Sequence, residues 1–409
     1  MSCMKLKVVL MLLFFLMGSG ILLARADVIV QCPGDTNGDA IPEIPLPNTQ
    51  CQSIAGSDGF SVMADGKIMY IFSFIDVTGV IPDQIMNVGT LAGKSPAPLI
   101  KAKEGGDFYL TLTVRAMVMR PDLFDPHSIH WHGFPNAASI FDGEPMASLT
   151  PNQGSSFTYY YKVPGSGTYL WHCHVEASEH MQMGMLGNLY VTSAQDELPG
   201  GTILGTHTHQ PDPDGNGPLA GDRYAYSDGD GSTRYDKDYP FQVISFDPDF
   251  HDANLNIQPL GFASMRDTYP LINGRGYPDT INPSTALGAV PENNNNPSQL
   301  VPTLITATQG QKILLRLSSV ATVRFYTLTS PSIPMKVVGK DTKLLRSSTS
   351  VNLYYDTHSL TLGGGQSADV ILDTQNVAPG TYFIYTSNLE ELSNNQEDFG
   401  GMMTEIVIQ

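Results

Sequence analysis

The sequence is short of charged residues, long apolar runs and cysteine. Charged residues make up only 15% of its 409 positions, and there are 4 Cys. Acidic residues outnumber basic ones by 40 to 22, and the resulting net charge of −18 argues against nucleic acid and anionic membrane surfaces as partners. A hydrophobic share of 41% excludes a disordered chain. Beyond the N-terminus no apolar run reaches about 18 residues, so we expect no membrane span.

The N-terminus has the features of a secretory signal peptide. Lys5 and Lys7 precede a short apolar run that glycines interrupt, and Ala24-Arg25-Ala26 fits the small-residue pattern of a cleavage site. A membrane anchor would need a longer unbroken run. We therefore expect residues 1–26 to be removed and the mature protein to be exported to the periplasm or the extracellular space.

The few cysteines have separate expected roles. Cys3 lies in the predicted signal peptide. Cys32 and Cys51 flank a Pro-rich segment, and in an oxidising compartment we expect them to form a disulfide. Cys173 is then left as a single thiol, which in an exported protein requires an explanation.

Residues that form turns and strands are abundant. The sequence contains 39 Gly, 29 Pro, 18 Tyr and 17 Phe, which favours a β-rich fold. Short strand patterns recur from about residue 61 and are separated by turn clusters. Residues 98–112 resemble residues 303–317, and residues 167–171 resemble residues 380–384, in the same order. This repeat predicts an all-β protein of two tandem Greek-key β-sandwich domains.

The repeat also sets the expected domain boundaries. After the signal peptide, residues 27–60 are turn-rich and are predicted to form an N-terminal extension. The first sandwich is expected over residues 61–195 and the second over residues 236–409. Between them, residues 196–235 are rich in Gly, Asp and Pro, which predicts a linker.

Most histidines gather with Cys173 in two short patches of the first repeat. The patches hold six of the 10 His, namely His127, His130, His132, His172, His174 and His180. A thiolate, two imidazoles and a weak thioether make the trigonal site of blue copper, which predicts His127, Cys173, His180 and Met185 as ligands. Bound copper would also explain why a single thiol survives export. Zinc suits Cys and His as well, but the nearby thioether and the lack of a second local Cys favour copper.

The other four of these histidines form two His-x-His pairs, His130 with His132 and His172 with His174. Residues i and i+2 of a strand point to the same face, so each pair can present two imidazoles to one spot. If the two strands are neighbours, four imidazoles converge on a second metal site. His172 and His174 flank Cys173, so a thiolate-bound copper would be connected to this second site through one or two residues.

These motifs resemble the copper motifs of multicopper oxidases, a family built of cupredoxin domains. The resemblance covers most of residues 61–409 and rests on His127-x-x-His130-x-His132-Gly133 and on His172-Cys173-His174 followed by His180 and Met185. It implies two cupredoxin-like domains, with type 1 copper bound by the four residues predicted above for blue copper. It also implies that the two His-x-His pairs supply half of the His ligands of a type 2/type 3 copper cluster.

The sequence departs from the family pattern in its spacing and in the position of the type 1 motif. The interval between Cys173 and His180 is longer than the usual one, so the ligand loop should bulge. The motif lies in the first domain, which resembles two-domain oxidases and copper nitrite reductases. Those proteins are homotrimers with catalytic copper at a subunit interface, so the resemblance implies a homotrimer here.

The second domain departs further, because it lacks the ligand motifs. Aligning the repeats places Tyr385, Thr386 and Ser387 opposite the His-Cys-His motif. His251 and His358 are isolated in sequence and are expected to be structural. A further pair, His207 with His209, lies in the predicted linker and could complete the cluster, although a linker pair is more often exposed at the surface.

The resemblance implies an exported copper-dependent oxidoreductase. Electrons from a small-molecule, metal-ion or redox-protein donor would enter type 1 copper and pass through Cys173 to the His-rich copper site, where dioxygen is reduced. Asp142 and Glu144 are candidate catalytic proton donors, although their Phe-Asp-Gly-Glu-Pro context also suits a turn. Two alternatives stay open. One is an enzyme of the nitrite reductase type, against which His130 and His174 argue, and the other is a non-catalytic blue-copper electron carrier or copper-binding protein.

Overall fold

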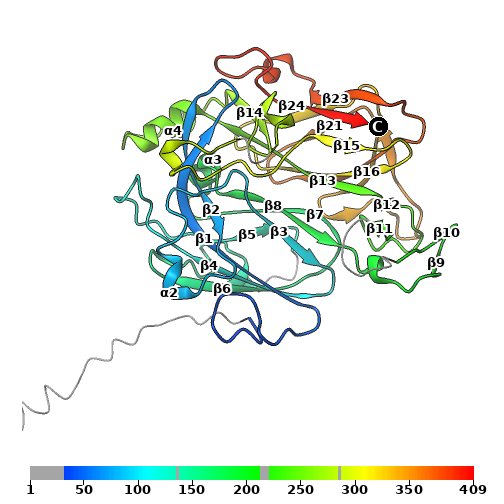
Figure 1. The fold of residues 1–409 in the computed structure, drawn as a ribbon, viewed down its shortest axis with the longest axis horizontal. Coiled ribbons are helices and arrows are strands. Elements are labelled where there is room, and N and C mark those ends of the chain that lie inside the picture. Colours follow the sequence, from blue (N-terminus) through cyan, green and yellow to red (C-terminus); the bar gives the residue numbers. More distant parts are fainter. Residues whose placement is uncertain (1–31, 135–137, 212–220, 284–286) are drawn as a thin grey trace, which may run out of the picture.

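The structure is a computed structural model that describes residues 32–134, 138–211, 221–283 and 287–409. The predicted signal peptide, residues 1–26, lies outside these residues. Within them, no helix combines the length and the apolar composition that crossing a membrane requires. Strands dominate, and they form two β-sandwiches, so the predicted all-β class and two-sandwich fold are confirmed (Figure 1).

The first sandwich consists of two mixed sheets of four strands, with orders β2-β1-β4-β6 and β3-β8-β7-β5. Its strands are β1 (Thr49–Val62), β2 (Ile68–Asp76), β3 (Ala97–Lys103), β4 (Asp107–Thr113), β5 (His130–His132), β6 (Ser156–Lys162), β7 (Gly167–His172) and β8 (Leu186–Thr192). Aromatic and aliphatic side chains from both sheets fill the space between them, among them Tyr159, Trp171 and Leu189, and Cys173 belongs to the same buried cluster. The predicted copper motifs are therefore attached to the core of this sandwich.

The second sandwich pairs a larger sheet, of order β14-β13-β16-β22-β18-β19 with β20 beside β18, with a sheet of order β15-β24-β23-β17-β21. Its strands are β13 (Lys237–Phe246), β14 (Tyr269–Ile272), β15 (Ile305–Ala307), β16 (Lys312–Ser319), β17 (Tyr326–Thr329), β18 (Met335–Lys340), β19 (Lys343–Leu344), β20 (Tyr355–Thr357), β21 (Ser359–Leu362), β22 (Ser367–Asp373), β23 (Gly380–Thr386) and β24 (Met403–Ile408). It has an aliphatic core of its own.

Short elements connect and cover the sandwiches. The helices are α2 (Pro82–Ile85), α3 (Ala177–Met183) and α4 (Pro248–Leu255), with 3-10 turns η1 (Ser139–Phe141), η2 (Ala194–Glu197), η3 (Phe262–Ser264), η4 (Asp279–Ile281), η6 (Pro291–Asn293) and η7 (Leu389–Leu392). The predicted linker, residues 196–235, contains the short strands β9 (Ile203–Leu204), β10 (His207–Thr208), β11 (Arg223–Tyr224) and β12 (Arg234–Tyr235). Figure 1 shows β9 and β10 at the right-hand edge of the molecule, apart from β5 and β7.

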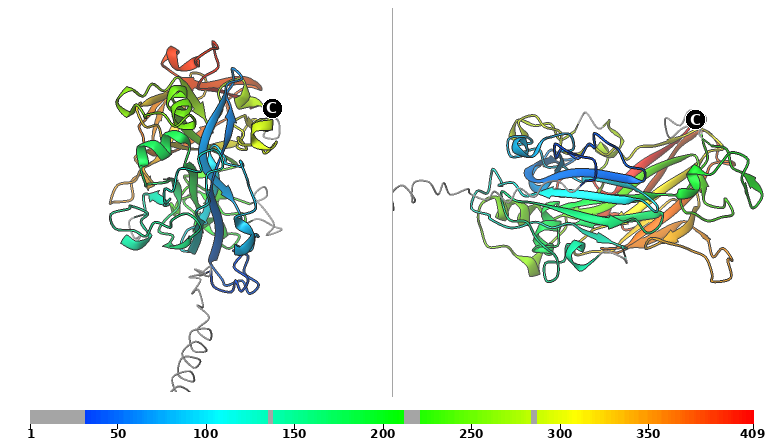
Figure 2. Two further views of the ribbon diagram at one scale, coloured as in Figure 1. Left: turned by 90° about the vertical axis from the view of Figure 1, so that its left-hand side faces the viewer. Right: turned by 90° about the horizontal axis from the view of Figure 1, so that it is seen from below.

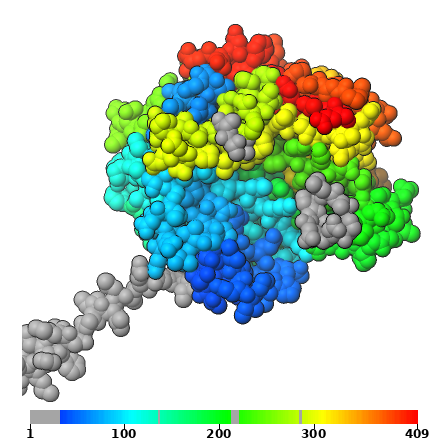
Figure 3. Space-filling view, viewed as in Figure 1, coloured from blue at the N-terminus to red at the C-terminus, as the bar shows by residue number. Residues whose placement is uncertain are grey.

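The two sandwiches pack directly against each other. A buried apolar cluster joins Met69 and Leu170 of the first to Phe246 and Leu271 of the second. Figure 2 shows the strands of both halves stacked in one body, and Figure 3 shows the C-terminal half, in yellow to red, lying against the blue and cyan N-terminal half. The second sandwich is therefore close enough to contribute backbone and side chains around the His motifs of the first.

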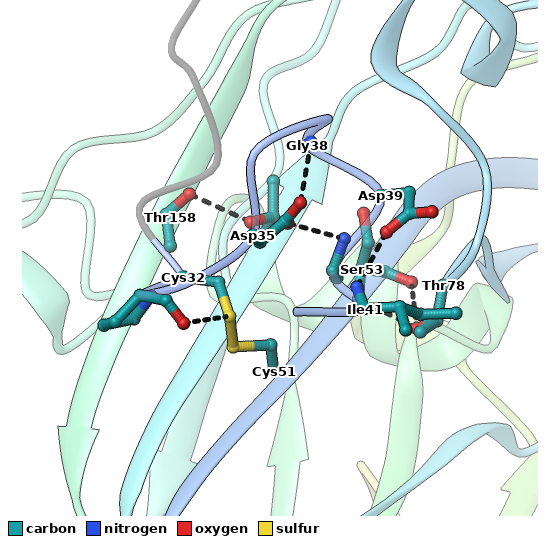
Figure 4. Close-up of a disulfide and its surroundings, with 12 residues drawn as sticks. Cys32, Asp35, Gly38, Asp39, Ile41, Cys51, Ser53, Thr78 and Thr158 are labelled. Carbon is teal, nitrogen blue, oxygen red and sulfur yellow. Dashed lines mark hydrogen bonds between the residues drawn. A yellow bond between two sulfur atoms is a disulfide. The ribbon is translucent and has the colours of Figure 1, made fainter. Parts of the chain in front are cut away.

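The N-terminal segment differs from the prediction in one respect. Strand β1 begins at Thr49 and pairs in parallel with β4, Thr49 opposite Asp107, so residues 49–60 belong to the first sheet rather than to an extension. The predicted disulfide between Cys32 and Cys51 is confirmed, and it ties the preceding loop to β1 (Figure 4). In that loop the Asp35 carboxylate accepts hydrogen bonds from the backbone N–H of Gly38 and of Ala40, both at 2.8 Å, as in an ordinary turn.

Candidate metal centre

Strands β5 and β7 bring the two His-x-His pairs together. They are antiparallel neighbours, with His130 opposite His172 and Trp131 opposite Trp171. Side chains alternate along a strand, so the histidines point to one face while both tryptophans are buried in the core of the sandwich. The alternation of apolar and His residues thus fixes which face carries the imidazoles.

A first group of candidate ligands consists of His127, Cys173 and His180. One ligand atom from each lies within 4.8 Å of the other two, and Cys173 Sγ is 3.2 Å from His180 Nδ1. All three side chains are buried, with exposed fractions of 2%, 0% and 0%. The backbone N–H of Ser128 donates to Cys173 Sγ at 3.4 Å, which orients the sulfur toward the loop that carries His127.

The loop after Cys173 folds back on itself. The Cys173 N–H donates to the carbonyl of Met185 at 3.0 Å, and the Met185 N–H donates to the carbonyl of His180 at 2.8 Å. Met185 is fully buried in the same core cluster as Cys173. The longer interval between Cys173 and His180 is accommodated by helix α3, which begins after Glu176 in a left-handed conformation with φ 44°. The expected bulge therefore takes the form of a short helix.

Burial controls the protonation of the first group. It raises the pKa of the Cys173 thiol to about 12, lowers the pKa of His180 to about 4 and holds the pKa of His127 well below its usual range. His127 Nδ1 and His180 Nε2 have no hydrogen-bond partner among the described residues. Two neutral imidazoles, a thiol and a buried thioether form a donor set that suits a soft metal ion such as copper.

The second group consists of three of the four paired histidines, and the fourth, His174, lies beside it. His130, His132 and His172 offer nitrogen atoms within 4.8 Å of one another, and the Nε2 atoms of His132 and His172 are 3.0 Å apart. The His174 ring lies 4.9 Å from that of His130 and 5.6 Å from that of His172. Burial lowers the pKa of His132 to about 4 and that of His172 to about 3, so these imidazoles are neutral and able to bind a metal.

The two predicted acidic residues differ in their position. His130 Nδ1 lies 2.7 Å from the Asp142 carbonyl and 3.8 Å from its carboxylate. The Glu144 carboxylate instead accepts the backbone N–H of Met146 at 3.1 Å, within its own turn. Asp142 thus lies beside the second group. Glu144 instead takes part in a turn, which is the other role that its sequence context suits.

A cavity of about 410 Å³ opens beside the second group. His132 and His172 form one wall, and residues 320–325 and 364–365 of the second sandwich form another. His132 Nδ1 is 3.3 Å from the carbonyl oxygen of Gly365. The second sandwich therefore borders the His pairs, although among the described residues it adds no side chain to a metal-ligand group.

The remaining histidines have other partners. His207 Nε2 is 2.6 Å from the Asp222 carboxylate, and His209 is buried with Nδ1 3.0 Å from the Tyr224 hydroxyl. His251 Nδ1 lies 2.5 Å from the carbonyl of Tyr70, and His358 Nδ1 lies 2.8 Å from that of Ser330. Within the described part of the chain, none of these four joins a metal-ligand group. The linker pair is thus not placed to complete the cluster within one chain.

Sequence reasoning missed Asp125 and Glu176. A carboxylate oxygen of each lies within 4.8 Å of the other and of a ring nitrogen of His180. Asp125 stands two positions before His127, and Glu176 lies in the lengthened loop after Cys173, but neither pattern by itself indicates that the two carboxylates meet.

Comparison with known proteins identifies the family of the chain. Family profiles described as multicopper oxidase match residues 77–196 and 257–409. Multicopper oxidase MmcO of Mycobacterium tuberculosis is 36% identical over 91 residues, and copper resistance protein A of Pseudomonas syringae pv. tomato is 35% identical over 108 residues. These stretches cover 22% and 26% of this chain but only 16% of each relative. The chain belongs to the multicopper oxidase family.

Solved structures share the fold over most of the chain. A blue copper oxidase from Nitrosomonas europaea has a TM-score of 0.61 and 21% identity, covering 88% of this chain and 86% of that one. A copper nitrite reductase from the same organism has a TM-score of 0.54 and 14% identity, covering 88% and 94%. At such identities the likeness extends to the fold, in agreement with two cupredoxin-type domains.

Proposed function

We propose that this protein is an exported oxidase that takes electrons from a reducing substrate at one copper centre and delivers them to dioxygen at another. His127, Cys173, His180 and Met185 would hold type 1 copper, and the two His-x-His pairs would hold the dioxygen-reducing copper. The observation that carries the proposal is the position of Cys173. Its sulfur belongs to the first group and its neighbour His172 belongs to the second, while the ring of its other neighbour, His174, lies 4.9 Å from that of His130.

Copper bound in these two groups would supply one-electron redox chemistry. The protein's own contribution is to hold the ligands in a dry and rigid arrangement. The Ser128 N–H directs Cys173 Sγ, and the Ser128 hydroxyl accepts the backbone N–H of His174 at 3.1 Å. Ser128 therefore holds both Cys173 and its neighbour His174 in position. Asp142, whose carbonyl is held against His130, would orient that imidazole and place a carboxylate next to the site.

The two His-x-His pairs would supply half of the His ligands of the type 2/type 3 copper cluster that the family resemblance implies. The other ligands would have to come from outside the chain, and a homotrimer with the site at a subunit interface is the arrangement we propose. Such an interface would also explain why the second sandwich has lost ligand motifs of its own. Dioxygen would reach the site through the cavity beside His132 and His172.

The test is a pair of substitutions in copper-loaded protein. His132→Ala should keep the visible absorption of type 1 copper but abolish oxygen consumption with an artificial electron donor, because His132 lies only in the second group. His358→Ala, with its ring against the carbonyl of Ser330, is the matched control and should change neither property. Oxygen consumption at the wild-type rate by His132→Ala would contradict a catalytic second group and favour an electron carrier.

A further inference from the structure

A second cavity, of about 530 Å³, lies where the end of β2 and the start of β3 meet the segment that precedes β15. None of the residues that line it belongs to a candidate metal-ligand group or to the cavity beside His132 and His172. Its volume is within the range of about 300–1,000 Å³ that is typical of small-molecule sites. The cavity is therefore large enough for an organic ligand and separate from the copper chemistry proposed above.

The wall of this cavity is mainly aliphatic. Ile75, Val77 and Ala92 belong to one buried apolar cluster, and Val80 and Val88 pack against that cluster. All five of these side chains line the cavity. A ligand with a hydrocarbon chain would remove the chain and this wall from water together, which favours binding.

Lys94 is the only basic residue that lines the cavity within the described part of the chain. It is half-buried, and its Nζ donates to the carbonyl of Pro297 at 2.6 Å. An ammonium group has three N–H donors, and the described residues give Lys94 neither a second acceptor for Nζ nor a salt bridge. Burial lowers the pKa of Lys94, because its charge is removed from water without a partner of opposite charge.

The other charged residue that lines the cavity, Asp76, is occupied by different partners. It is exposed, and its carboxylate accepts the side-chain amide of Gln52 at 3.1 Å and the backbone N–H of Thr78 at 2.9 Å. Leu300, which also lines the cavity, is 42% exposed. The cavity thus opens to solvent, and its cation keeps two donors free for a ligand.

We propose that this cavity binds an amphiphilic monocarboxylate, such as a medium-chain fatty acid, with the carboxylate against Lys94 and the hydrocarbon chain along the aliphatic wall. The two free N–H donors match the two oxygens of one carboxylate. The aliphatic wall distinguishes this ligand from a small hydrophilic anion such as acetate, and the ammonium group distinguishes it from a neutral hydrocarbon. The site does not depend on the proposed function, because no candidate copper ligand lines it.

The test is calorimetric titration of the full chain with decanoate, below the concentration at which decanoate forms micelles. Lys94→Met removes the charge and keeps the length of the side chain, and Lys343→Met is the matched control, since it removes an exposed cation of the second sandwich. We expect Lys94→Met to weaken decanoate binding by about tenfold or more relative to this control. Binding of the neutral decanol should be the same in both variants. Among shorter carboxylates, each methylene removed should weaken binding about threefold to fourfold.

A second variant tests the aliphatic part of the site. Leu300→Asp places a carboxylate at the mouth of the cavity and should weaken the binding of both decanoate and decanol. Because Leu300 is partly exposed, this variant should fold normally, and circular dichroism checks the folding of all variants. Oxygen consumption and visible absorption of the copper-loaded protein should stay unchanged in Lys94→Met.

Three results would overturn the proposal. They are no decanoate binding by the folded wild type, equal decanoate binding by Lys94→Met and Lys343→Met, and decylamine binding as tight as that of decanoate. Wild-type affinity in Leu300→Asp would likewise place the ligand elsewhere. None of these results bears on the copper centres, whose own test is the spectrum and oxygen consumption of His132→Ala.

Discussion

Three consecutive residues, His172, Cys173 and His174, connect the two groups of candidate ligands. Cys173 belongs to the first group, and His172 belongs to the second. The thiol is fully buried, and burial raises its pKa to about 12, so the free side chain would be an unreactive thiol. A bound metal cation is what would favour the thiolate in such a position. This residue is therefore the most direct probe of the first group.

The replacement Cys173→Ser should abolish the intense visible absorption of the copper-loaded protein, because that absorption requires a thiolate–copper(II) bond. The serine hydroxyl is close to the thiol in size, so both sandwiches should stay folded. Absorption spectra, with circular dichroism as the control for folding, measure both properties. Visible absorption of wild-type strength in Cys173→Ser would contradict the assignment of this thiol as a ligand.

His251 makes a separate, pH-dependent contribution to stability. It is fully buried, and burial lowers its pKa from 6.5 to about 4. Between these values the unfolded chain binds a proton that the folded protein does not, so the free energy of unfolding falls as the pH falls toward 4. His251→Gln should remove up to about 3 kcal/mol of this pH dependence. Denaturant unfolding of both proteins at neutral and acidic pH measures it, and equal pH dependences would contradict it.

At the level of secondary-structure elements, strand β1 packs closely against His127 of the first group. A Cβ atom at Gly56 would lie 2.8 Å from Cδ2 of His127, closer than packed side chains allow. Glycine at this position therefore permits the close approach of the strand to the imidazole. The position was not apparent from the sequence, because nothing in the order of residues indicates that β1 passes behind His127.

Gly56→Ala should displace His127 and thereby weaken or shift the visible absorption of bound copper, with a cost of about 1–3 kcal/mol in stability. Gly165→Ala is the matched control, since a Cβ atom there has no heavy atom within 4 Å. The spectrum and the thermal unfolding of the two variants are compared with those of the wild type. Identical spectra for both variants would mean that β1 does not position His127.

The sequence predicted some elements well and others poorly, for physical reasons. The spacing of His130 and His132 on either side of Trp131 in β5 is a local pattern, and it correctly indicated imidazoles on one face. The start of β1 was missed because this strand buries polar residues. Asp58 is fully buried, for example, and it accepts the Tyr70 hydroxyl at 2.9 Å. Such a strand is stabilised by partners that are distant in sequence. The pairing of Asp125 with Glu176 likewise arises only when two loops meet.

At the scale of the whole molecule, the two sandwiches have different roles. The first carries both groups of candidate ligands, and the second lines the cavity beside His132 and His172. The net charge of −18 fits a positively charged electron donor better than an anionic one. The repeat in sequence predicted two similar folds, but the orientation of one sandwich against the other depends on a buried interface that the repeat does not specify.

Copper content measured together with the visible and electron paramagnetic resonance spectra of the purified, copper-loaded protein tests the central claim most directly. We predict a blue or green protein with more than two coppers per chain, one of them bound to thiolate. About one copper per chain would indicate an electron carrier, and about two would indicate the nitrite reductase type. A copper-replete protein without visible thiolate–copper absorption would contradict the binding of copper by Cys173.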